Sequence, residues 1–159
     1  MNNFEIDEIM SKLGLESVYG GIYPCDLLPM DLCKRCNYGI ICNQSNSQSY
    51  GTHWVAIFMP KQGSLEFFNS YGIPPKNEYF LKFIEKDNIY YCYNSVQIQD
   101  YNSDVCGQYC IFFLICRFLG IKFDQFINIF DKKNLEQNDQ FIEELIGSLG
   151  AKDGYYSDW

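Results

Sequence analysis

The sequence predicts one globular domain, residues 1–159, that contains both helices and strands. Its length lies within the usual range for a single domain, and 47% hydrophobic and 18% aromatic residues are enough for one core. Apolar residues repeat at helical spacing near both ends of the chain, whereas short apolar runs bounded by turn residues lie between them. No internal repeat or low-complexity tract interrupts this pattern.

The first part of the chain predicts one helix, one loop and one strand. Asn2 or Asn3 can cap a helix that ends before Gly14, because the apolar residues in between recur at helical spacing. Residues 20–26 contain two glycines and a proline and are interpreted as a turn-rich loop. Residues 38–43 predict a short strand, which a polar loop follows.

Residues 53–59 predict a central strand, because the side chains on both of its faces are largely apolar. Pro60 ends this strand, and a short turn leads into a second strand over residues 64–69. The two strands are expected to form an antiparallel hairpin. Asn69, at the end of the second strand, should therefore return close to His53 at the start of the first.

The second half of the chain predicts four helices and two short strands. The helix that starts at Cys106 is mostly apolar, so it should lie in the core, and Ser103 or Asp104 can cap it. Prolines, glycines or polar residues bound the other segments. The helices are expected over residues 77–86, 106–119, 123–130 and 138–149, the strands over residues 89–93 and 96–99, and an aromatic tail over residues 155–159.

Charge and hydropathy narrow the range of partners. Acidic residues outnumber basic ones by 20 to 12, and the sequence pI is about 4.5. Binding along a nucleic acid backbone needs a surface of Lys and Arg, so we expect no nucleic acid partner. The N-terminus is acidic and polar, and the longest apolar stretch, residues 110–116, is far shorter than the roughly 18 residues that span a bilayer. We expect a soluble, intracellular monomer that is not secreted.

Eight cysteines could serve as disulfides, metal ligands or free thiols. A disulfide framework is typical of short secreted chains with small cores, and this chain has neither property. Cys33 and Cys36 form one tight pair with Cys25 and Cys42 nearby, whereas a structural zinc site usually takes two tight pairs. We therefore expect mostly free, buried thiols, with no metal and no cofactor.

One cysteine has the surroundings of a catalytic nucleophile. Cys106 lies in the first turn of a predicted helix, where free backbone N–H groups and the helix dipole favour a negative sulfur. A neighbouring imidazolium lowers the pKa of a thiol further, and the chain has a single histidine, His53. The sequence thus predicts a Cys106 thiolate that His53 activates.

Two side-chain amides complete the predicted site. Asn69 is the candidate that orients His53, because an amide oxygen can accept the N–H of an imidazole. Gln99, on the segment before the Cys106 helix, is the candidate donor to the oxyanion of an acyl-transfer reaction. Each residue alone also has a structural explanation, in the core or in a turn. Their joint occurrence, with the histidine first and the cysteine last, favours a cysteine nucleophile site.

Three blocks of the sequence carry these residues in one arrangement. They are residues 40–43 with 51–54, which include His53; residues 67–72, which include Asn69; and residues 99–110, which include Gln99 and Cys106. In this arrangement the chain resembles the adenovirus protease (adenain) family, and more closely the adenain-like cysteine proteases of Polinton/Maverick elements and related viruses. The resemblance covers most of the chain, and the third block is the most specific.

The resemblance implies an α+β, cysteine-protease-like fold in which a central mixed sheet packs on the nucleophile-bearing helix and on flanking helices. It implies Cys106 as the nucleophile, His53 as the base, Gln99 as the oxyanion-hole donor and position 69 as the partner of the histidine. It also implies a cysteine endopeptidase that cleaves viral or element-encoded precursor proteins at small, glycine-containing sites during virion maturation. The implied location is the virion and the host nucleus or cytoplasm.

The chain departs from the family at Asn69, where the relatives usually have Glu or Asp. An amide orients an imidazole but stabilises the imidazolium less, so a lower rate or a narrower pH range is expected. Adenovirus proteases also use a disulfide-linked peptide and DNA as cofactors. Cys92 lies in the corresponding region at a shorter spacing from Gln99, and the acidic charge disfavours DNA, so neither cofactor is carried over, and an activating peptide stays an open question.

Two other functions fit the same residues. Proteases that remove ubiquitin-like modifiers share the order of histidine, acid or amide, glutamine and cysteine, and they also cut after glycine. A catalytically silent binding or assembly module is the alternative from a different class, suggested by Asn69 and by the aromatic tail. The presence of Cys106, His53 and Gln99 together favours an enzyme.

Overall fold

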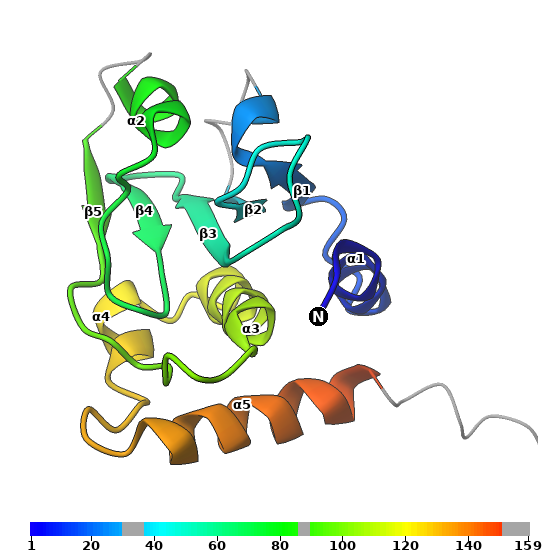
Figure 1. Ribbon diagram of the computed structural model, residues 1–159, viewed down its shortest axis with the longest axis vertical. Coiled ribbons are helices and arrows are strands. Elements are labelled where there is room, and N and C mark those ends of the chain that lie inside the picture. The colour runs from blue at the N-terminus through cyan, green and yellow to red at the C-terminus, as the bar shows by residue number, and fades with distance from the viewer. Residues whose placement is uncertain (30–36, 86–89, 151–159) are drawn as a thin grey trace, which may run out of the picture.

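The computed structural model describes residues 1–29, 37–85 and 90–150, and within them five strands form one mixed sheet flanked by helices (Figure 1). The α+β fold class is therefore confirmed. The strands are β1 (Tyr19–Pro24), β2 (Tyr38–Asn43), β3 (Trp54–Met59), β4 (Leu65–Phe68) and β5 (Tyr91–Tyr93). The helices are α1 (Asn3–Lys12), the short 3₁₀ helix η1 (Cys25–Leu27), α2 (Glu78–Glu85), α3 (Cys106–Phe118), α4 (Phe123–Ile127) and α5 (Leu135–Gly150).

β3 lies at the centre of the sheet, whose strand order is β1-β2-β3-β4-β5. It pairs antiparallel with β2 and β4, and the outer pairs β1–β2 and β4–β5 are parallel. Every residue of β3 after Trp54 is buried, as predicted for a strand covered on both faces. The predicted hairpin is confirmed, since Ala56 pairs with Phe68 and Phe58 pairs with Glu66.

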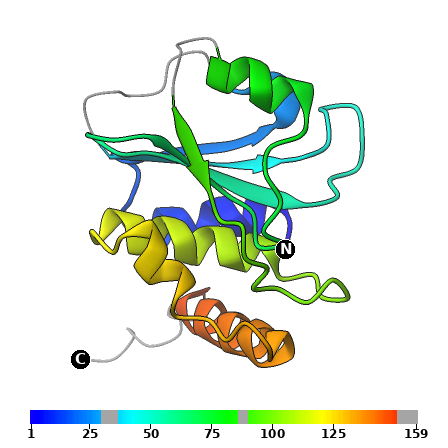
Figure 2. The same cartoon turned by 90° about the vertical axis from the view of Figure 1, so that its left-hand side faces the viewer.

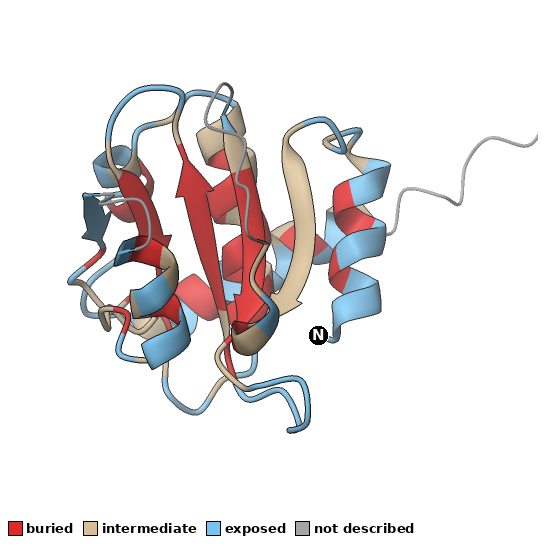
Figure 3. Ribbon diagram, turned by 90° about the horizontal axis from the view of Figure 1, so that it is seen from above, coloured by how far each residue is buried: buried red, intermediate tan, exposed pale blue. Residues whose placement is uncertain are grey.

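Helices cover both faces of the sheet (Figure 2). α2 and η1 cover one face, where Phe67 and Phe80 belong to a buried cluster. α1 and α3 cover the other face, and α5 packs beyond α3, so that Phe68, Phe113 and Ile142 share a second cluster. Buried residues dominate the central strands and the inner sides of these helices (Figure 3). The helix that begins at Cys106 therefore lies in the core, against the sheet, as expected.

α1 begins at a capping box. The Asn2 side chain accepts the Glu5 N–H at 3.1 Å, and the Glu5 carboxylate accepts the Asn2 N–H at 2.7 Å. Ile6 and Met10 of this helix are fully buried. Gly14 follows the helix with φ of 67°, a conformation that glycine adopts without strain. The capping box fixes where the segment before α1 lies, which matters for the site.

Residues 19–24 form strand β1, so the prediction of a loop over residues 20–26 is wrong for most of that segment. The two glycines serve the strand instead of a turn. A side chain at Gly20 would overlap the Tyr38 hydroxyl, since its Cβ would lie 1.9 Å away, and Gly21 has φ of 101° where the pairing register shifts. Glycine marks close approaches and bulges in strands as well as turns, which is why the sequence pattern was ambiguous.

Residues 96–99 form no strand, so that prediction is wrong. The N–H groups of Ile98 and Gln99 donate to the Ser70 carbonyl, and side chains satisfy the Ile98 carbonyl, so no neighbouring strand is needed.

The start of α3 at Cys106 agrees with the prediction, but the predicted cap by Ser103 or Asp104 is wrong. Val105 is the N-cap residue, and no side chain bonds to the helix start. The first N–H groups of α3 are therefore left without a capping side chain.

The remaining elements differ from their predictions mainly at their ends. α2, α4 and β5 are shorter than predicted, and α5 starts earlier, at Leu135. Several predicted features lie outside the described residues. They are Lys86 at the end of the helix predicted over residues 77–86, Ile89, the tail over residues 155–159, and the Cys33–Cys36 pair considered for zinc.

The six cysteines within the described residues are free thiols, and five of them are buried. Over the same residues, the structure shows no group of three or more His, Cys, Asp or Glu side chains that could hold a metal ion. No helix in the described ranges is long and apolar enough to cross a membrane.

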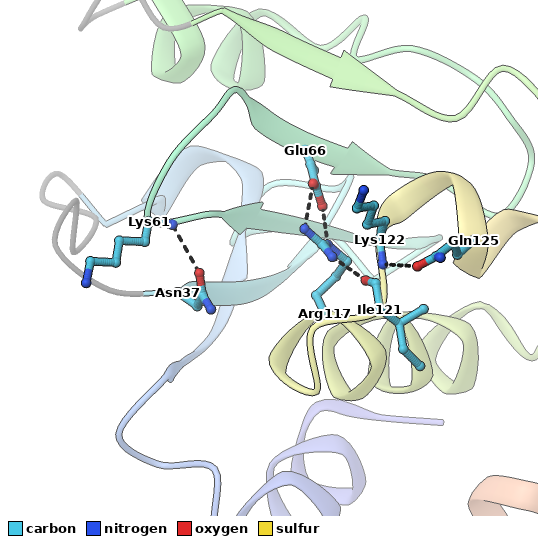
Figure 4. A network of polar contacts seen from close by, with 7 residues as sticks. All are labelled: Asn37, Lys61, Glu66, Arg117, Ile121, Lys122 and Gln125. Atoms are coloured by element: carbon cyan, nitrogen blue, oxygen red, sulfur yellow. Dashed lines mark hydrogen bonds and ion pairs between the residues drawn. The ribbon is translucent and has the colours of Figure 1, made fainter.

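A buried ion pair joins α3 to β4 (Figure 4). Arg117 donates from Nε and Nη2 to the Glu66 carboxylate at 2.6 and 2.9 Å, and both side chains are about one tenth exposed, 11% and 10%. The guanidinium also donates to the Ile121 carbonyl and lies 4.8 Å from the centroid of the Phe58 ring. These contacts hold the helix that carries Cys106 against the sheet.

Candidate active site

The predicted site lies where β3 begins, β4 ends and α3 begins. His53 directly precedes β3, and Asn69 directly follows β4. Antiparallel pairing brings these two positions together, and His53 Nε2 lies 3.0 Å from Asn69 Oδ1. The proximity predicted from the hairpin is therefore confirmed. His53 is 7% exposed and Asn69 is fully buried, so the contact is largely shielded from water.

A tight turn and a second asparagine hold Asn69. The Gly72 N–H donates to the Asn69 carbonyl at 2.8 Å, and the Tyr71 N–H donates to Asn69 Oδ1 at 3.0 Å. Gly72 has φ of 68°, and a Cβ there would lie 2.6 Å from the Val96 carbonyl carbon, so only glycine fits. The Asn94 side chain accepts the Asn69 N–H at 2.9 Å and donates to its carbonyl at 2.6 Å.

These hydrogen bonds define the proton position on the imidazole. The Tyr71 backbone N–H can only donate, so the atom of Asn69 that receives it, and that faces His53, is the amide oxygen. His53 Nε2 therefore carries a hydrogen, and Nδ1 of the neutral ring keeps a lone pair. Asn69 Nδ2 is buried and has no hydrogen-bond partner within the described part of the chain.

Two tyrosines stack outward from the imidazole. The Tyr71 ring lies 4.4 Å from the His53 ring, centroid to centroid, with 12° between the planes. Tyr101 packs on Tyr71 at 4.9 Å and is 62% exposed. An aromatic face attracts a cation, so the stack stabilises His53 when the ring is protonated.

Cys106 lies beside the start of β3. Its Sγ accepts the backbone N–H of Trp54 at 3.5 Å, and Trp54 directly follows His53 in the chain. The side chain is 8% exposed and faces the cleft described below. Among the contacts of the described residues, no hydrogen bond joins the thiol to the His53 ring. Catalytic contacts of this kind are often loose before substrate binds.

Burial dominates the protonation of both groups. Burial raises the pKa of the Cys106 thiol, although N–H groups of Trp54 and Gly107 act in the opposite direction. Burial also lowers the pKa of His53, more than the hydrogen bond that the ring donates to Asn69 raises it. Both groups are therefore neutral near pH 7. The expected fall of the thiol pKa is wrong for this state, because a neutral imidazole gives no charge to offset the loss of hydration.

Gln99 lies on the loop before α3, as predicted, and is fully buried. Its Oε1 accepts the Ser70 hydroxyl at 2.5 Å, and its Nε2 donates to the carbonyl and hydroxyl oxygens of Ser103 at 3.0 and 3.1 Å. The amide thus has one orientation, with its hydrogens toward the segment that enters α3. Its role as an oxyanion donor stays a prediction, since that role needs an Nε2 hydrogen to face the substrate.

A cleft of about 590 Å³ opens beside Cys106. Its walls are formed by four parts of the chain: the segment Met1–Asn3, strand β1, the loop between β2 and β3, and the start of α3. The Trp54 indole N–H donates to the Met1 carbonyl at 3.2 Å, which attaches the segment before α1 to this wall. Asp104, two residues before α3, adds a carboxylate to the lining of the cleft. The volume is within the usual range for a ligand site.

The four predicted site residues lie around one point of the fold, on four different parts of the chain. Sequence reasoning missed several of their partners, among them Ser70, Tyr71 and Trp54. The one signal of these three in the sequence is adjacency to Asn69 and to His53. Side-chain hydrogen bonds and ring stacking across the fold leave no periodic pattern that could have identified them.

No family model matches this chain. The chain is 34% identical over 95 residues to the uncharacterized protein V9 of Sputnik virophage, which covers 46% of this chain and 53% of that protein. It is 30% identical over 108 residues to the SUMO-1 cysteine protease S273R of African swine fever virus, which covers 60% of this chain and 39% of that protein. The chain therefore spans about half or less of the length of these relatives.

The fold also matches a solved structure. The crystal structure of the pS273R protease of ASFV aligns with a TM-score of 0.53 and 22% sequence identity, over 89% of this chain and 66% of that one. At this identity the match shows a shared fold. The chain is thus homologous to a viral cysteine protease and has the fold of one.

Proposed function

We propose that this chain is an adenain-like cysteine endopeptidase that cleaves viral or element-encoded precursor proteins. One observation carries the proposal: the His53–Asn69 contact lies beside the Cys106 thiol, and that thiol lines a cleft. The homology to a viral cysteine protease supports the same reaction. The three blocks around His53, Asn69 and Cys106 support the adenain-like assignment.

In the first step, the Cys106 sulfur attacks the carbonyl carbon of the scissile peptide bond. The thiol proton moves to His53 Nδ1, and the Nε2–H of the resulting imidazolium stays hydrogen-bonded to Asn69 Oδ1. The carbonyl oxygen takes the electron pair of the C=O bond. The Cys106 N–H at the start of α3 and the Gln99 amide bind this oxyanion. Because both groups start neutral, proton transfer accompanies the attack.

In the second step, the tetrahedral intermediate collapses and the C–N bond breaks. The His53 imidazolium gives its Nδ1 proton to the leaving amine, and a thioester on Cys106 remains. Water then attacks the thioester carbonyl while His53 accepts a proton from it. Collapse of this second intermediate breaks the C–S bond and releases the carboxylic acid product, and His53 returns its proton to the sulfur, which restores the Cys106 thiol.

The proposed substrates are extended protein segments with small, glycine-containing cleavage sites, cut during virion maturation. The resemblance to adenain-like proteases supports this choice. By the same argument the protein acts in the virion and in the host nucleus or cytoplasm. We propose that it acts as a monomer on protein or peptide substrates, without nucleic acid, metal or membrane.

A second candidate function is removal of SUMO-like modifiers from proteins. It is favoured by one observation, since the relative from African swine fever virus bears the name SUMO-1 cysteine protease. A SUMO vinyl sulfone probe, which reacts with the catalytic cysteine of such proteases, distinguishes the two functions. Labelling of Cys106 by this probe supports the second candidate, and labelling by glycine-containing peptide probes alone supports the first.

Peptide cleavage by matched variants tests the proposal. The wild type is expected to cut glycine-containing peptides from viral structural precursors, and Cys106→Ala and His53→Ala should each lower kcat by at least about 1,000-fold. Cys92→Ala, which removes an exposed thiol that is not among the residues lining the cleft, is the control and should be fully active. Unchanged cleavage by Cys106→Ala contradicts the proposal.

Alkylation reports the thiol without any substrate. Mass spectrometry after brief treatment with iodoacetamide should show Cys106 reacting faster than the buried Cys110 and Cys116. In His53→Ala, Cys106 should react more slowly, because no imidazole then accepts the thiol proton. Labelling of Cys106 in the wild type no faster than that of Cys110 and Cys116 would instead favour the catalytically silent module.

A further inference from the structure

A buried carboxylate on α5 accepts hydrogen bonds from the helix that carries Cys106 and from the loop that carries Gln99. Asp139 is 8% exposed, and its Oδ1 accepts the Tyr109 hydroxyl at 2.8 Å while its Oδ2 accepts the Asp100 N–H at 3.1 Å. Tyr109 lies one turn after Cys106 on α3, and Asp100 directly follows Gln99. A single carboxylate therefore links the helix of the proposed nucleophile to the loop of the proposed oxyanion donor.

The backbone on the other side of Gln99 is held as firmly. The Ile98 carbonyl accepts the Asn138 side-chain amide at 3.0 Å, and it lies 2.9 Å from the Tyr109 hydroxyl, which shares its single hydrogen between this oxygen and Asp139. The N–H groups of Ile98 and Gln99 donate to the Ser70 carbonyl at 2.9 and 3.2 Å. The Gln99 loop thus takes its position from contacts with α3, α5 and the turn after β4, and not from a sheet.

Burial of the Asp139 carboxylate destabilises the fold unless hydrogen bonds compensate for the lost hydration. A buried carboxylate loses its hydration, and an apolar side chain of similar size often stabilises a core at least as well. Within the described ranges Asp139 forms no ion pair that would offset this loss. Its hydrogen bonds to Tyr109 and Asp100 are the contacts that compensate it.

We propose that Asp139 is a positioning residue that sets the geometry between the Cys106 thiol and the Gln99 amide. The inference rests on the proposed peptidase function, in which both groups contact the same substrate carbonyl. A misplacement of about 1 Å at such a site can cost about 100-fold in rate. Asp139 touches neither the substrate nor the reacting atoms, and it acts through Tyr109 and Asp100.

Two substitutions at Asp139 separate hydrogen bonding from packing. In Asp139→Asn, the amide oxygen can accept the Asp100 N–H, and the NH₂ group can donate to the Tyr109 hydroxyl, which still donates to Ile98. This variant should keep kcat within about threefold of wild type. Asp139→Leu removes both bonds and should lower kcat about 10- to 100-fold with KM within about twofold. Glu143→Ala, at an exposed carboxylate on the same helix, is the control and should match the wild type.

A double-mutant cycle tests whether the effect passes through Gln99. In a Gln99→Ala background, Asp139→Leu should lower kcat by less than about twofold further, because the group that it positions is absent. Tyr109→Phe, which removes the hydroxyl and keeps the ring, should behave as Asp139→Leu does. An equal loss of kcat in both backgrounds, or full kcat in Asp139→Leu, overturns the inference.

Two readouts distinguish failure of this inference from failure of the proposed function. Alkylation of Cys106 needs no oxyanion donor, so its rate should be the same in wild type and Asp139→Leu even though kcat differs. If the wild type cleaves no peptide, the proposed function fails, and hydrogen exchange then judges the positioning alone. Exchange of the Asp100 amide should be at least about tenfold faster in Asp139→Leu than in Asp139→Asn. Equal exchange in the two variants overturns the inference.

Discussion

In the proposed mechanism, His53 is the residue whose charge determines the chemistry at this site. It must be neutral to accept the thiol proton, so activity should fall as the pH drops through the His53 pKa. Burial lowers that pKa, and the neutral Asn69 offsets the effect only in part. The acid limit of activity should therefore lie below the ordinary histidine pKa of about 6.5. On the acid side, an amide at position 69 widens the pH range instead of narrowing it.

Asn69→Asp tests this account of the imidazole. A carboxylate favours the imidazolium and raises the His53 pKa, so the acid limb of the kcat/KM profile should move to higher pH by about 1 unit or more. The new side chain can still accept the Tyr71 N–H and the His53 N–H. The measurement is kcat/KM for a peptide between pH 4.5 and 9, a range chosen to cover about two units on either side of neutrality.

Asn69→Ala is the matched control for that profile. It removes the hydrogen bond that orients the imidazole, so kcat should fall, but the acid limb should not move to higher pH. An acid limb that stays in place in Asn69→Asp would mean that position 69 does not control the charge of His53.

Residue chemistry explains which parts of the site the sequence could reveal. Cys106 and His53 were identifiable because they occur together with Asn69 and Gln99, with the histidine first and the cysteine last, although each residue alone also has a structural explanation. Asn69 was placed beside His53 because a hairpin returns the chain to its start. Ser70 and Asp139 were not identifiable, since a hydroxyl and a carboxylate have many structural roles and their partners lie 29 and 39 residues away in the chain.

At the scale of elements, the turn after β4 positions His53, the proposed base. Its four residues, Asn69 to Gly72, orient the imidazole, hold Gln99 and stack on His53. The turn closes only because Gly72 has a positive φ and its backbone lies against that of Val96. A single residue without a side chain therefore supports every contact in the turn.

Gly72→Ala is expected to damage both stability and activity. The Cβ would lie 2.6 Å from a backbone carbon, and alanine at positive φ is strained, so the free energy of unfolding should fall by about 1 to 3 kcal/mol. Urea denaturation gives this value, and kcat should drop in the protein that remains folded. Gly63→Ala is the control, since Gly63 also has a positive φ but its nearest neighbour is a flexible proline carbon at 3.7 Å. Equal effects in both variants would contradict a special role for the turn.

The Arg117–Glu66 pair sets the stability of the contact between α3 and β4. Removing one partner leaves the other buried and unpaired, so Arg117→Leu should lower the free energy of unfolding by about 3 kcal/mol or more. The double variant Arg117→Leu with Glu66→Leu should recover much of this loss, because no charge remains buried. A single variant as stable as wild type would show that the pair contributes little. Chemical denaturation at pH 7 is the measurement.

Strong apolar patterns predicted their elements well, and weak ones did not. β3 and α3 were located because nearly all their residues are apolar and both lie in the core. Residues 20–26 and 96–99 were misread because their structure depends on long-range contacts. Pairing with β2 makes most of the first segment a strand, and hydrogen bonds to Ser70 and to Asn138 of α5 hold the second segment outside the sheet.

At the scale of the whole molecule, the sheet separates two hydrophobic cores, one on each face. The candidate site lies where β3 begins, β4 ends and α3 begins. The larger core includes α1, α3 and α5, and the smaller one includes α2 and η1. Three of the catalytic candidates, His53, Asn69 and Cys106, therefore lie at the ends of β3, β4 and α3, which are largely buried.

Net charge is the other property of the whole chain that has a consequence. A formal charge of -8 repels a polyanion, so double-stranded DNA should neither bind at 100 mM salt, about physiological strength, nor raise kcat. A gel-shift assay and a peptide assay with added DNA check this. Polylysine serves as the control polymer and should bind. Stimulation by DNA would contradict the expectation drawn from the charge.

Trp54 gives the protein a built-in optical signal. Trp54 lines the cleft, where its indole donates to the Met1 carbonyl and its backbone N–H donates to the Cys106 sulfur. The chain has one other tryptophan, Trp159, and Trp159→Phe would leave a single tryptophan, which can be excited selectively over tyrosine. A peptide that enters the cleft changes the polarity around this ring and hence its emission. In a Cys106→Ala protein, association and release of unlabelled substrates can then be followed by stopped-flow fluorescence, separately from cleavage.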